Sequence, residues 1–222
     1  RGPGNTRPTG ERSGMTRPSV QGLLSLFLRL SDADRFDAAT RQPILSQTAK
    51  LLEIVQRNRE TVYGQAHGFA SIRSVRDYQT HVPPSTYDTL APYVDRMLHG
   101  EPRVLTSERP SMYATTSGTT GRSKFIPVTP SYLREYSHAV HVHTYRLFAD
   151  FPDLLQGQAL VPSSTDREGT TKTGTPYGAI SGYLTRTQPA FIKRFYVLPF
   201  ELCHVKDVDA KYYLTLRYAL AA

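Results

Sequence analysis

A run of hydroxyl and glycine residues between two short apolar segments carries the clearest chemical signal in this sequence. Five of the six residues from Thr115 to Thr120 bear a hydroxyl group, and Gly118 and Gly121 bracket the last two of them. Glycine lets the backbone approach a ligand closely, and successive N–H groups in such a loop form a concave nest that binds anions. Lys124 adds a compact positive charge three residues after Gly121. Together these groups suit a polyphosphate.

Two other interpretations of this segment have to be weighed. A Walker loop requires lysine directly after its last glycine, and here two residues separate Gly121 from Lys124. Serine, threonine and glycine also form ordinary turns, so a plain hairpin loop between two strands is the simpler alternative. The ordered string from Thr116 to Lys124, placed between the apolar runs 112–114 and 125–128, favours phosphate binding.

The string Thr-Ser-Gly-Thr-Thr-Gly-Arg-Ser-Lys at 116–124 resembles the phosphate-binding signature of the adenylate-forming superfamily. Three further motifs narrow this resemblance to the auxin-responsive, or Gretchen Hagen, family of acyl-acid-amido synthetases. These motifs are Tyr63-Gly64-x-x-His67-Gly68-Phe69, Val82-Pro83-Pro84-Ser85-x-Tyr87 and Gly178-Ala179-Ile180-Ser181-Gly182-Tyr183. The resemblance runs from about Leu23 to the end of the chain and covers only the front part of the family's length.

The resemblance implies both a fold and an activity. The fold is α/β: the front part of the large N-terminal domain of an adenylate-forming enzyme, incomplete at its C-terminus, with helices packed on a mixed or parallel β-sheet. The activity is that of an ATP-dependent ligase that joins a carboxylic acid to an amino acid through an acyl-adenylate. We therefore expect ATP and Mg²⁺ as cofactors, a small carboxylic acid and an amino acid as substrates, and the missing C-terminal part of the enzyme as a partner. The fragment alone is expected to be inactive.

The resemblance also assigns roles to individual residues. Lys124 is the expected catalytic residue, because its charge offsets that of the phosphates. The triphosphate of ATP is expected to contact the loop residues Thr116, Ser117, Gly118, Thr119, Thr120 and Gly121, together with Lys124. The expected lining of the acyl-acid pocket is Tyr177, Ile180 and Tyr183, although simple packing explains these side chains equally well. No residue is assigned as a metal ligand.

One departure from the plant enzymes limits what the resemblance implies. Those enzymes tend to carry Ser-Ser-Gly-Thr-Ser at the loop, whereas this chain carries Thr-Ser-Gly-Thr-Thr. Plant-hormone substrates therefore do not follow. Three alternatives remain open: an acyl- or aryl-CoA-type ligase with a thiol acceptor, a non-catalytic module that binds phosphate anions, and a basic nucleic-acid binder.

Composition sets outer limits on these functions. The chain has 222 residues, of which 39% are hydrophobic and 21% charged, as expected of a globular protein. A single cysteine, Cys203, excludes an intramolecular disulfide and suits a reducing, cytoplasmic location. The apolar segment 20–30 is too short to span a bilayer, so we expect no membrane association.

The net charge of +8 is not concentrated in one block of lysine or arginine. The first 17 residues contribute +3 of it, and the rest is spread thinly. This distribution favours a solvated basic surface over nucleic-acid binding. Residues 1–14 are predicted to be a disordered basic tail, and residues 15–222 a partial N-terminal adenylate-forming domain with its phosphate loop at 115–124.

Helical patterns dominate the chain on both sides of the loop. In the first half we predict a short helix over 23–30 and a helix from Pro43 that Gly64 and Gly68 end. Two further helices are predicted from the capping boxes Ser74 with Asp77 and Ser85 with Asp88. A long helix is predicted from Pro130. It carries His138, His141 and His143, which we interpret as ordinary surface histidines because no acidic partner lies nearby in the sequence.

The last quarter of the chain mixes strand, loop and helix signals. We predict a buried strand over 158–163, a long functional loop over 169–182 and a short strand over 195–200. A final helix is predicted to be capped by Asp207 or Asp209 and to expose an apolar face that later elements cover.

Overall fold

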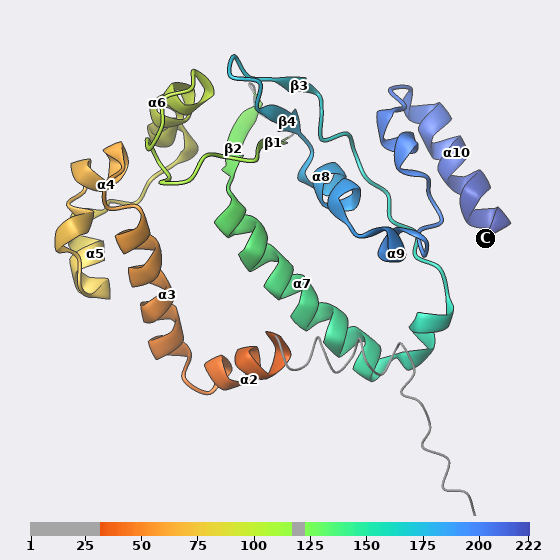
Figure 1. Cartoon of the computed structure of the whole chain (residues 1–222), viewed down its shortest axis with the longest axis horizontal. Helices are drawn as coiled ribbons and strands as arrows, with labels where there is room; N and C mark the ends of the chain where they lie inside the picture. Colours follow the sequence, from red (N-terminus) through yellow and green to blue (C-terminus); the bar gives the residue numbers. More distant parts are fainter. Residues whose placement is uncertain (1–31, 117–122) are drawn as a thin grey trace, which may run out of the picture.

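The computed structural model describes residues 32–116 and 123–222, which form a mainly helical chain around one small β-sheet (Figure 1). The helices of the first half lie on one side of the sheet and the C-terminal helices on the other, while α7 extends away from it. The predicted tail at 1–14 and the predicted helix at 23–30 lie outside the described residues. A mixed sheet with packed helices confirms the predicted α/β class.

The regular elements follow one another along the chain as follows. The helices are α2 (Asp34–Thr40), α3 (Pro43–Arg57), α4 (Val62–Ala66), α5 (Val75–His81), α6 (Tyr87–Leu98), α7 (Pro130–Asp150), α8 (Ile180–Thr187), α9 (Ala190–Lys193) and α10 (Val208–Ala221). Short 3₁₀ turns are η2 (Phe69–Ser71), η3 (Pro152–Gln156) and η4 (Phe200–His204). The strands are β1 (Met112–Thr116), β2 (Lys124–Val128), β3 (Gly169–Thr170) and β4 (Pro176–Gly178).

The four strands are ordered β2-β1-β4-β3. β1 and β2 form an antiparallel hairpin whose register runs from Met112↔Val128 to Thr116↔Lys124. β1 pairs in parallel with β4, and β3 closes the sheet antiparallel to β4. β2 is therefore an edge strand, which explains why it tolerates Pro127, a residue without a ladder N–H.

Two apolar clusters hold the first half of the chain together. The first joins α3, η2 and α5 through buried Val55, Phe69 and Ile72. The second joins α6 to the sheet through Met97 and Tyr113, and Phe125 and Tyr177 pack against it. The second cluster therefore fixes the hairpin and β4 to the same helix.

The helix predicted from Pro43 ends earlier than expected. It stops at Arg57, and a separate short helix, α4, contains Gly64 in its middle. A Cβ atom at Gly64 would lie 2.2 Å from the carbonyl oxygen of Asn58. Gly64 is thus needed for a close backbone contact inside a helix, and the prediction that it ends a helix was wrong. The prediction for Gly68 is confirmed, because Gly68, with φ of 60°, directly follows the C-cap of α4.

Of the two predicted capping boxes, the N-cap at Ser74 is confirmed, with the Asp77 carboxylate accepting from the Arg73 N–H, and the other box is displaced by one residue. Ser74 caps α5 by accepting a hydrogen bond from the Asp77 N–H at 3.1 Å. At α6 the N-cap is Thr86, whose N–H donates to the Thr89 hydroxyl at 3.1 Å. Ser85 instead donates to the Pro83 carbonyl, so the predicted Ser85–Asp88 pair was wrong.

The long helix predicted from Pro130 is confirmed as α7, and Thr129 caps it. The expectation that its histidines have no acidic partner was wrong. His141 Nδ1 lies 2.5 Å from a carboxylate oxygen of Asp32, and His138 Nε2 lies 3.8 Å from the other oxygen. Asp32 is only 8% exposed and lies 109 residues from His141, so no residue pattern near the histidines indicates this contact.

The last quarter of the chain differs most from the predictions. Residues 158–163 and 195–200 are not strands: they share one isolated bridge, Ala159↔Tyr196, and Leu160 is 50% exposed. The predicted loop 169–182 instead forms the β3–β4 hairpin and the start of α8. The cap of the final helix is confirmed at Asp207, which accepts a hydrogen bond from the Ala210 N–H at 2.7 Å.

Candidate functional site

The hairpin β1–β2 brings the ends of the predicted phosphate loop together. Its last paired residues are Thr116 and Lys124, both exposed. The two strands predicted on either side of the loop are therefore confirmed. The predicted contact residues Ser117, Gly118, Thr119, Thr120 and Gly121 lie outside the described residues, so the direction of their amides stays a prediction.

The hairpin is anchored at the end away from the loop. Met112, Tyr113 and Val128 are almost completely buried. Burial raises the pKa of the Tyr113 phenol to about 12, so this side chain is neutral at physiological pH. The two strands are therefore fixed by burial at the end that lies away from Thr116 and Lys124.

Tyr87, the first residue of α6, contacts the second strand beside the loop. Its phenol oxygen accepts a hydrogen bond from the Phe125 N–H at 2.8 Å. Its ring lies under the amine of Lys124, with 5.4 Å between Nζ and the ring centroid. Among the described residues no carboxylate pairs with Lys124, which leaves its charge available to an anion.

β1, the strand before the loop, also makes a side-chain contact, on the side away from β2. The Thr115 hydroxyl donates to Oε2 of Glu168 at 3.1 Å. Glu168 is held in turn by its backbone N–H, which donates to the Tyr177 carbonyl at 2.9 Å. Sequence reasoning missed both Tyr87 and Glu168 as neighbours of the loop, because their contacts cross between separate elements.

The three predicted substrate residues occupy β4 and the helix that follows it. Tyr177 pairs with Tyr113 in the sheet, and its ring packs edge-on against Phe125 with 5.2 Å between centroids. Ile180 and Tyr183 follow on the first turn of α8, both half-buried. The structure thus brings Tyr177 next to the hairpin; a substrate role for the three residues stays a prediction.

An ion pair with a buried carboxylate lies beside β4 and α8. Asp166 is only 1% exposed, and its Oδ2 accepts a hydrogen bond from Arg186 Nε at 2.8 Å. Its Oδ1 has no hydrogen-bond partner among the described residues. A Cβ atom at Gly182 would lie 2.1 Å from the Ser164 carbonyl oxygen, so the chain beside Asp166 packs directly on the backbone of α8.

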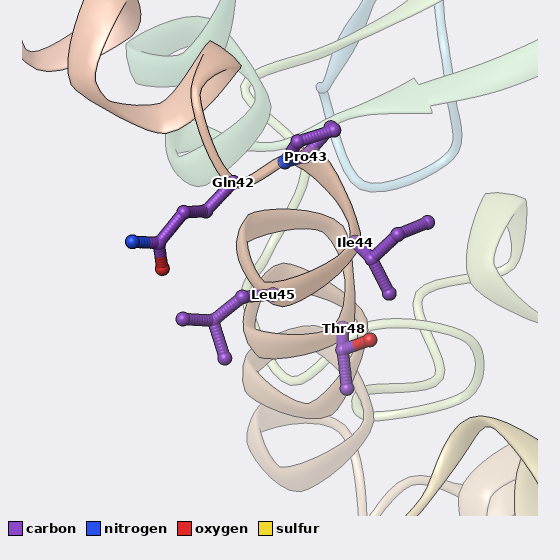
Figure 2. Close-up of a pocket in the computed structure, with 5 residues that line it drawn as sticks. All are labelled: Gln42, Pro43, Ile44, Leu45 and Thr48. Atoms are coloured by element: carbon purple, nitrogen blue, oxygen red, sulfur yellow. The ribbon is translucent and has the colours of Figure 1, made fainter.

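Two hollows in the surface of the described residues lie away from the hairpin. One, of about 480 Å³, is formed around the first turn of α3 by Gln42, Pro43, Ile44, Leu45 and Thr48 (Figure 2). Ile44 and Leu45 are 75% and 64% exposed there, so it is an open apolar depression without a charged group. It offers nothing to a phosphate.

The described residues offer little that could bind a metal ion or act as a reactive thiol. Over residues 32–116 and 123–222, histidine, cysteine and acidic side chains nowhere gather in a group of three that could hold a metal ion. Cys203 is buried, and burial together with the charge of Asp166 raises the pKa of its thiol. A protonated, inaccessible thiol is a poor nucleophile. Of the helices described, none has the length and apolar character needed to cross a bilayer.

The model of the GH3 family N-terminal domain matches residues 32–222. The chain therefore belongs to the GH3 family, as the motifs around the hairpin predicted.

Individual relatives are acid–amino acid ligases from plants. The chain is 31% identical over 131 residues to the indole-3-acetic acid-amido synthetase GH3.15 of Arabidopsis thaliana, which covers 58% of this chain and 22% of that protein. It is 27% identical over 143 residues to the jasmonoyl-L-amino acid synthetase GH3.3 of Oryza sativa subsp. japonica, covering 64% of this chain and 31% of that protein.

Two solved structures have a fold similar to that of this chain. A structure of the GH3.15 acyl acid amido synthetase superposes with a TM-score of 0.67 at 23% identity, over 91% of this chain and 34% of the other. A structure of AtGH3.15 in complex with 2,4-DB superposes with a TM-score of 0.63 at 22% identity, over 82% of this chain and 30% of the other. The present chain thus spans between about a fifth and a third of the length of these relatives.

Proposed function

We propose that this chain forms the phosphate-binding part of an ATP-dependent ligase that joins a carboxylic acid to an amino acid. One observation carries the proposal: a rigid hairpin ends in the pair Thr116–Lys124, on either side of a loop built of hydroxyls and glycines. The relatives supply the reaction class, because they are amido synthetases that act on acids and amino acids.

The proposed reaction has two steps. A carboxylate oxygen of the acid attacks the α-phosphorus of ATP, the bond to the bridging oxygen breaks, and pyrophosphate leaves with the electron pair. The amine of the amino acid then attacks the acyl carbon of the adenylate, loses a proton and displaces AMP. Catalysis of the first step rests on positioning and on neutralising charge.

The roles of the residues in that step follow from their chemistry. Amides and hydroxyls of residues 116–121 are proposed to hold the β- and γ-phosphates, while Lys124 offsets the negative charge that grows on pyrophosphate. Mg²⁺, when bound together with ATP, would supply further neutralisation of the phosphate charge, and no described residue is assigned to hold it. Tyr177, Ile180 and Tyr183 are proposed to contact the acid. A cytoplasmic location is proposed because the chain has a single, buried cysteine.

The acceptor is proposed to be an amine and not a thiol such as coenzyme A, since the relatives named above form amides. A non-catalytic module that binds phosphate anions would share the hairpin but not the chemistry. Exchange of labelled pyrophosphate into ATP separates the two, because it requires reversible adenylate formation and depends on the acid supplied.

The proposed role of Lys124 is tested by Lys124→Ala, with Lys206→Ala as a matched control at an exposed lysine. A charge-assisted phosphate contact is worth roughly 1.5–3 kcal/mol, so ATP affinity should fall about tenfold to a hundredfold. The melting temperature should stay unchanged, because Lys124 is exposed. ATP affinity is measured by titration of the purified chain, and pyrophosphate exchange is measured with the full-length enzyme across a panel of aromatic and aliphatic acids. Equal ATP affinity in the two variants would remove Lys124 from the site.

A further inference from the structure

The strand that leads out of the phosphate loop has an open edge, and Tyr87 occupies it. β2 is the outermost strand of the sheet, so its outward N–H groups find no partner strand within residues 32–116 and 123–222. The phenol oxygen of Tyr87 accepts one of them, the N–H of Phe125, at 2.8 Å. Tyr87 thereby fixes the backbone directly after Lys124.

The same tyrosine also contacts the charged end of Lys124. The amine lies 5.4 Å from the centroid of the Tyr87 ring, a distance at which the negative face of an aromatic ring attracts a cation. Lysine has four rotatable side-chain bonds and is exposed here, so without a contact its amine samples a large volume. The ring restricts that volume to the space above α6 and β2.

Phe125 itself is held from three directions. Its backbone is bound by Tyr87, its ring packs against Tyr177, and it pairs in the sheet with Thr115. Thr115 is bound in turn by Glu168 on the other side of the hairpin. Tyr87 thus fixes Phe125 on one side of the hairpin, and Glu168 fixes Thr115 on the other. The position of the Lys124 amine therefore depends mainly on the conformation of its own side chain and on the Tyr87 ring beneath it.

We propose that Tyr87 is a positioning residue for Lys124. Its hydroxyl fixes the backbone at Phe125, and its ring holds the amine beside the end of the hairpin, where the polyphosphate binds. This inference rests on the proposed function, since it concerns the same phosphate site. Pre-ordering the amine reduces the entropy lost when the phosphate binds, so Tyr87 contributes to affinity without contacting ATP.

A double-mutant cycle tests whether Tyr87 acts through Lys124. The variants are Tyr87→Phe, Tyr87→Leu, Lys124→Ala and the double variant Tyr87→Leu with Lys124→Ala. Tyr132→Phe is the control, because Tyr132 is an exposed tyrosine whose hydroxyl makes no hydrogen bond to the described residues. ATP affinity is measured by NMR titration of the 222-residue chain, a method that reaches millimolar dissociation constants, and exchange of the Phe125 amide with solvent is recorded in the same samples.

Each variant has a distinct expected result. Tyr87→Phe should weaken ATP binding about two- to tenfold and accelerate exchange of the Phe125 amide, because both hydrogen bonds between the Tyr87 hydroxyl and the Phe125 backbone are lost. Tyr87→Leu should weaken binding several-fold further, because the ring is lost as well. In the Lys124→Ala background, Tyr87→Leu should change affinity less than twofold. Tyr132→Phe should change neither measurement.

The outcomes separate failure of this inference from failure of the proposed function. If Lys124→Ala weakens binding and Tyr87→Leu does not, Tyr87 does not position Lys124, and only the inference fails. The inference fails equally if Tyr87→Leu costs the same with and without Lys124, since Tyr87 would then act on the fold in general. If the unmodified chain does not bind ATP, or if Lys124→Ala binds it as well as the unmodified chain does, the proposed function fails first.

Discussion

The two neighbours of β1 in the sheet are held in place by different kinds of contact. On one side β2 follows along the chain after a short connection, and pairing over five residues fixes it. On the other side β4 arrives from a distant part of the sequence, pairs over two residues, and relies on a buried ion pair and on glycine contacts behind it. The first side depends on local pattern, whereas the second depends on tertiary packing.

This difference decides how each side responds to substitution. On the β2 side, the hydrogen bonds outside the ladder lie at half-buried or exposed positions, and each is worth little to folding. On the β4 side, the groups are buried and closely packed, so a change leaves an unpaired charge or a steric clash. We therefore expect large effects on stability around β4 and α8 and small ones around β2.

Arg186→Leu should have the largest effect, because it leaves the buried carboxylate of Asp166 without its partner. Removal of the arginine from an ion pair whose carboxylate is buried lowers the unfolding free energy by roughly 3–5 kcal/mol. Arg167→Leu is the control, since the Arg167 side chain is exposed and makes no hydrogen bond within the described residues. Urea denaturation followed by circular dichroism measures both. Equal stability of the two variants would show that β4 does not depend on this pair.

The converse substitution sharpens the same point. Asp166→Asn should cost less than Arg186→Leu, because the Arg186 side chain is 32% exposed and water can solvate its charge once the carboxylate is gone. In addition, Asp166 Oδ1 has no hydrogen-bond partner among the described residues, so part of the cost of burying this charge is already uncompensated. A larger loss for Asp166→Asn than for Arg186→Leu in the same denaturation series would contradict this account.

Gly182→Ala should have the next largest effect, again on the β4 side. The added methyl group would lie 2.1 Å from the Ser164 carbonyl oxygen, closer than any real contact, so the backbone has to move. Overpacking of this kind costs roughly 1–3 kcal/mol. Gly157→Ala is the matched control, because the nearest atom to its added methyl would be 3.8 Å away. A melting temperature for Gly182→Ala within a degree of the control would mean that α8 shifts freely.

The same contrast explains what the sequence could predict. The hairpin, the helix from Pro130 and the caps at Ser74 and Asp207 were predictable, because each rests on residues a few positions apart. The β3–β4 hairpin was missed because its strands are two and three residues long, too short for an alternating pattern. Its stability comes instead from pairing with β1 and from the segment beside Asp166.

The residues of the candidate site fall into the same two groups: those that are adjacent in the sequence and those that only the fold brings together. The loop residues and Lys124 were found because they form one continuous string. Tyr87 was quoted only as part of a family motif, and Glu168 was not singled out, because neither carries a local sign that it lies beside the loop. The pairing of Asp32 with His141 was missed for the same reason, since 109 residues separate them. Contacts between separate elements depend on the fold and are not encoded in residue spacing.

On the β2 side, Thr89→Val should have a modest effect by loosening the start of α6, where Tyr87 lies. The Thr89 hydroxyl accepts from the Thr86 N–H at 3.1 Å and donates to the Thr86 carbonyl at 2.8 Å. Loss of a helix cap costs about 1 kcal/mol. Ser85→Ala should cost less, because Ser85 does not cap the helix. If thermal denaturation shows Ser85→Ala to be the more damaging change, the assignment of the cap is wrong.

The smallest effect is expected at Glu108, which holds the start of α7 just after β2. Its carboxylate accepts hydrogen bonds from the Ser131 hydroxyl at 2.7 Å and from the Ser131 N–H at 2.9 Å. The hydroxyl of Ser131 lowers the pKa of Glu108 most, followed by the backbone N–H of Ser131 and the charge of Arg134. Because the pKa is lower in the folded state, the carboxylate contributes stability above the ordinary glutamate pKa near 4.5, and this contribution is lost as the pH falls through the folded-state value.

Glu108→Gln should therefore lower the unfolding free energy by about 1 kcal/mol or less at pH 7, a small value because the side chain is 29% exposed and partly screened by solvent. The difference from the unmodified chain should shrink as the pH is lowered from 5 to 3, as expected for a carboxylate whose folded-state pKa is depressed. Glu201→Gln is the control, since Glu201 is exposed and accepts no hydrogen bond within the part of the chain that the structure describes. Urea denaturation at several pH values measures both variants. A Glu108→Gln deficit that stays constant down to pH 3 would show that the start of α7 is held by packing and not by this carboxylate.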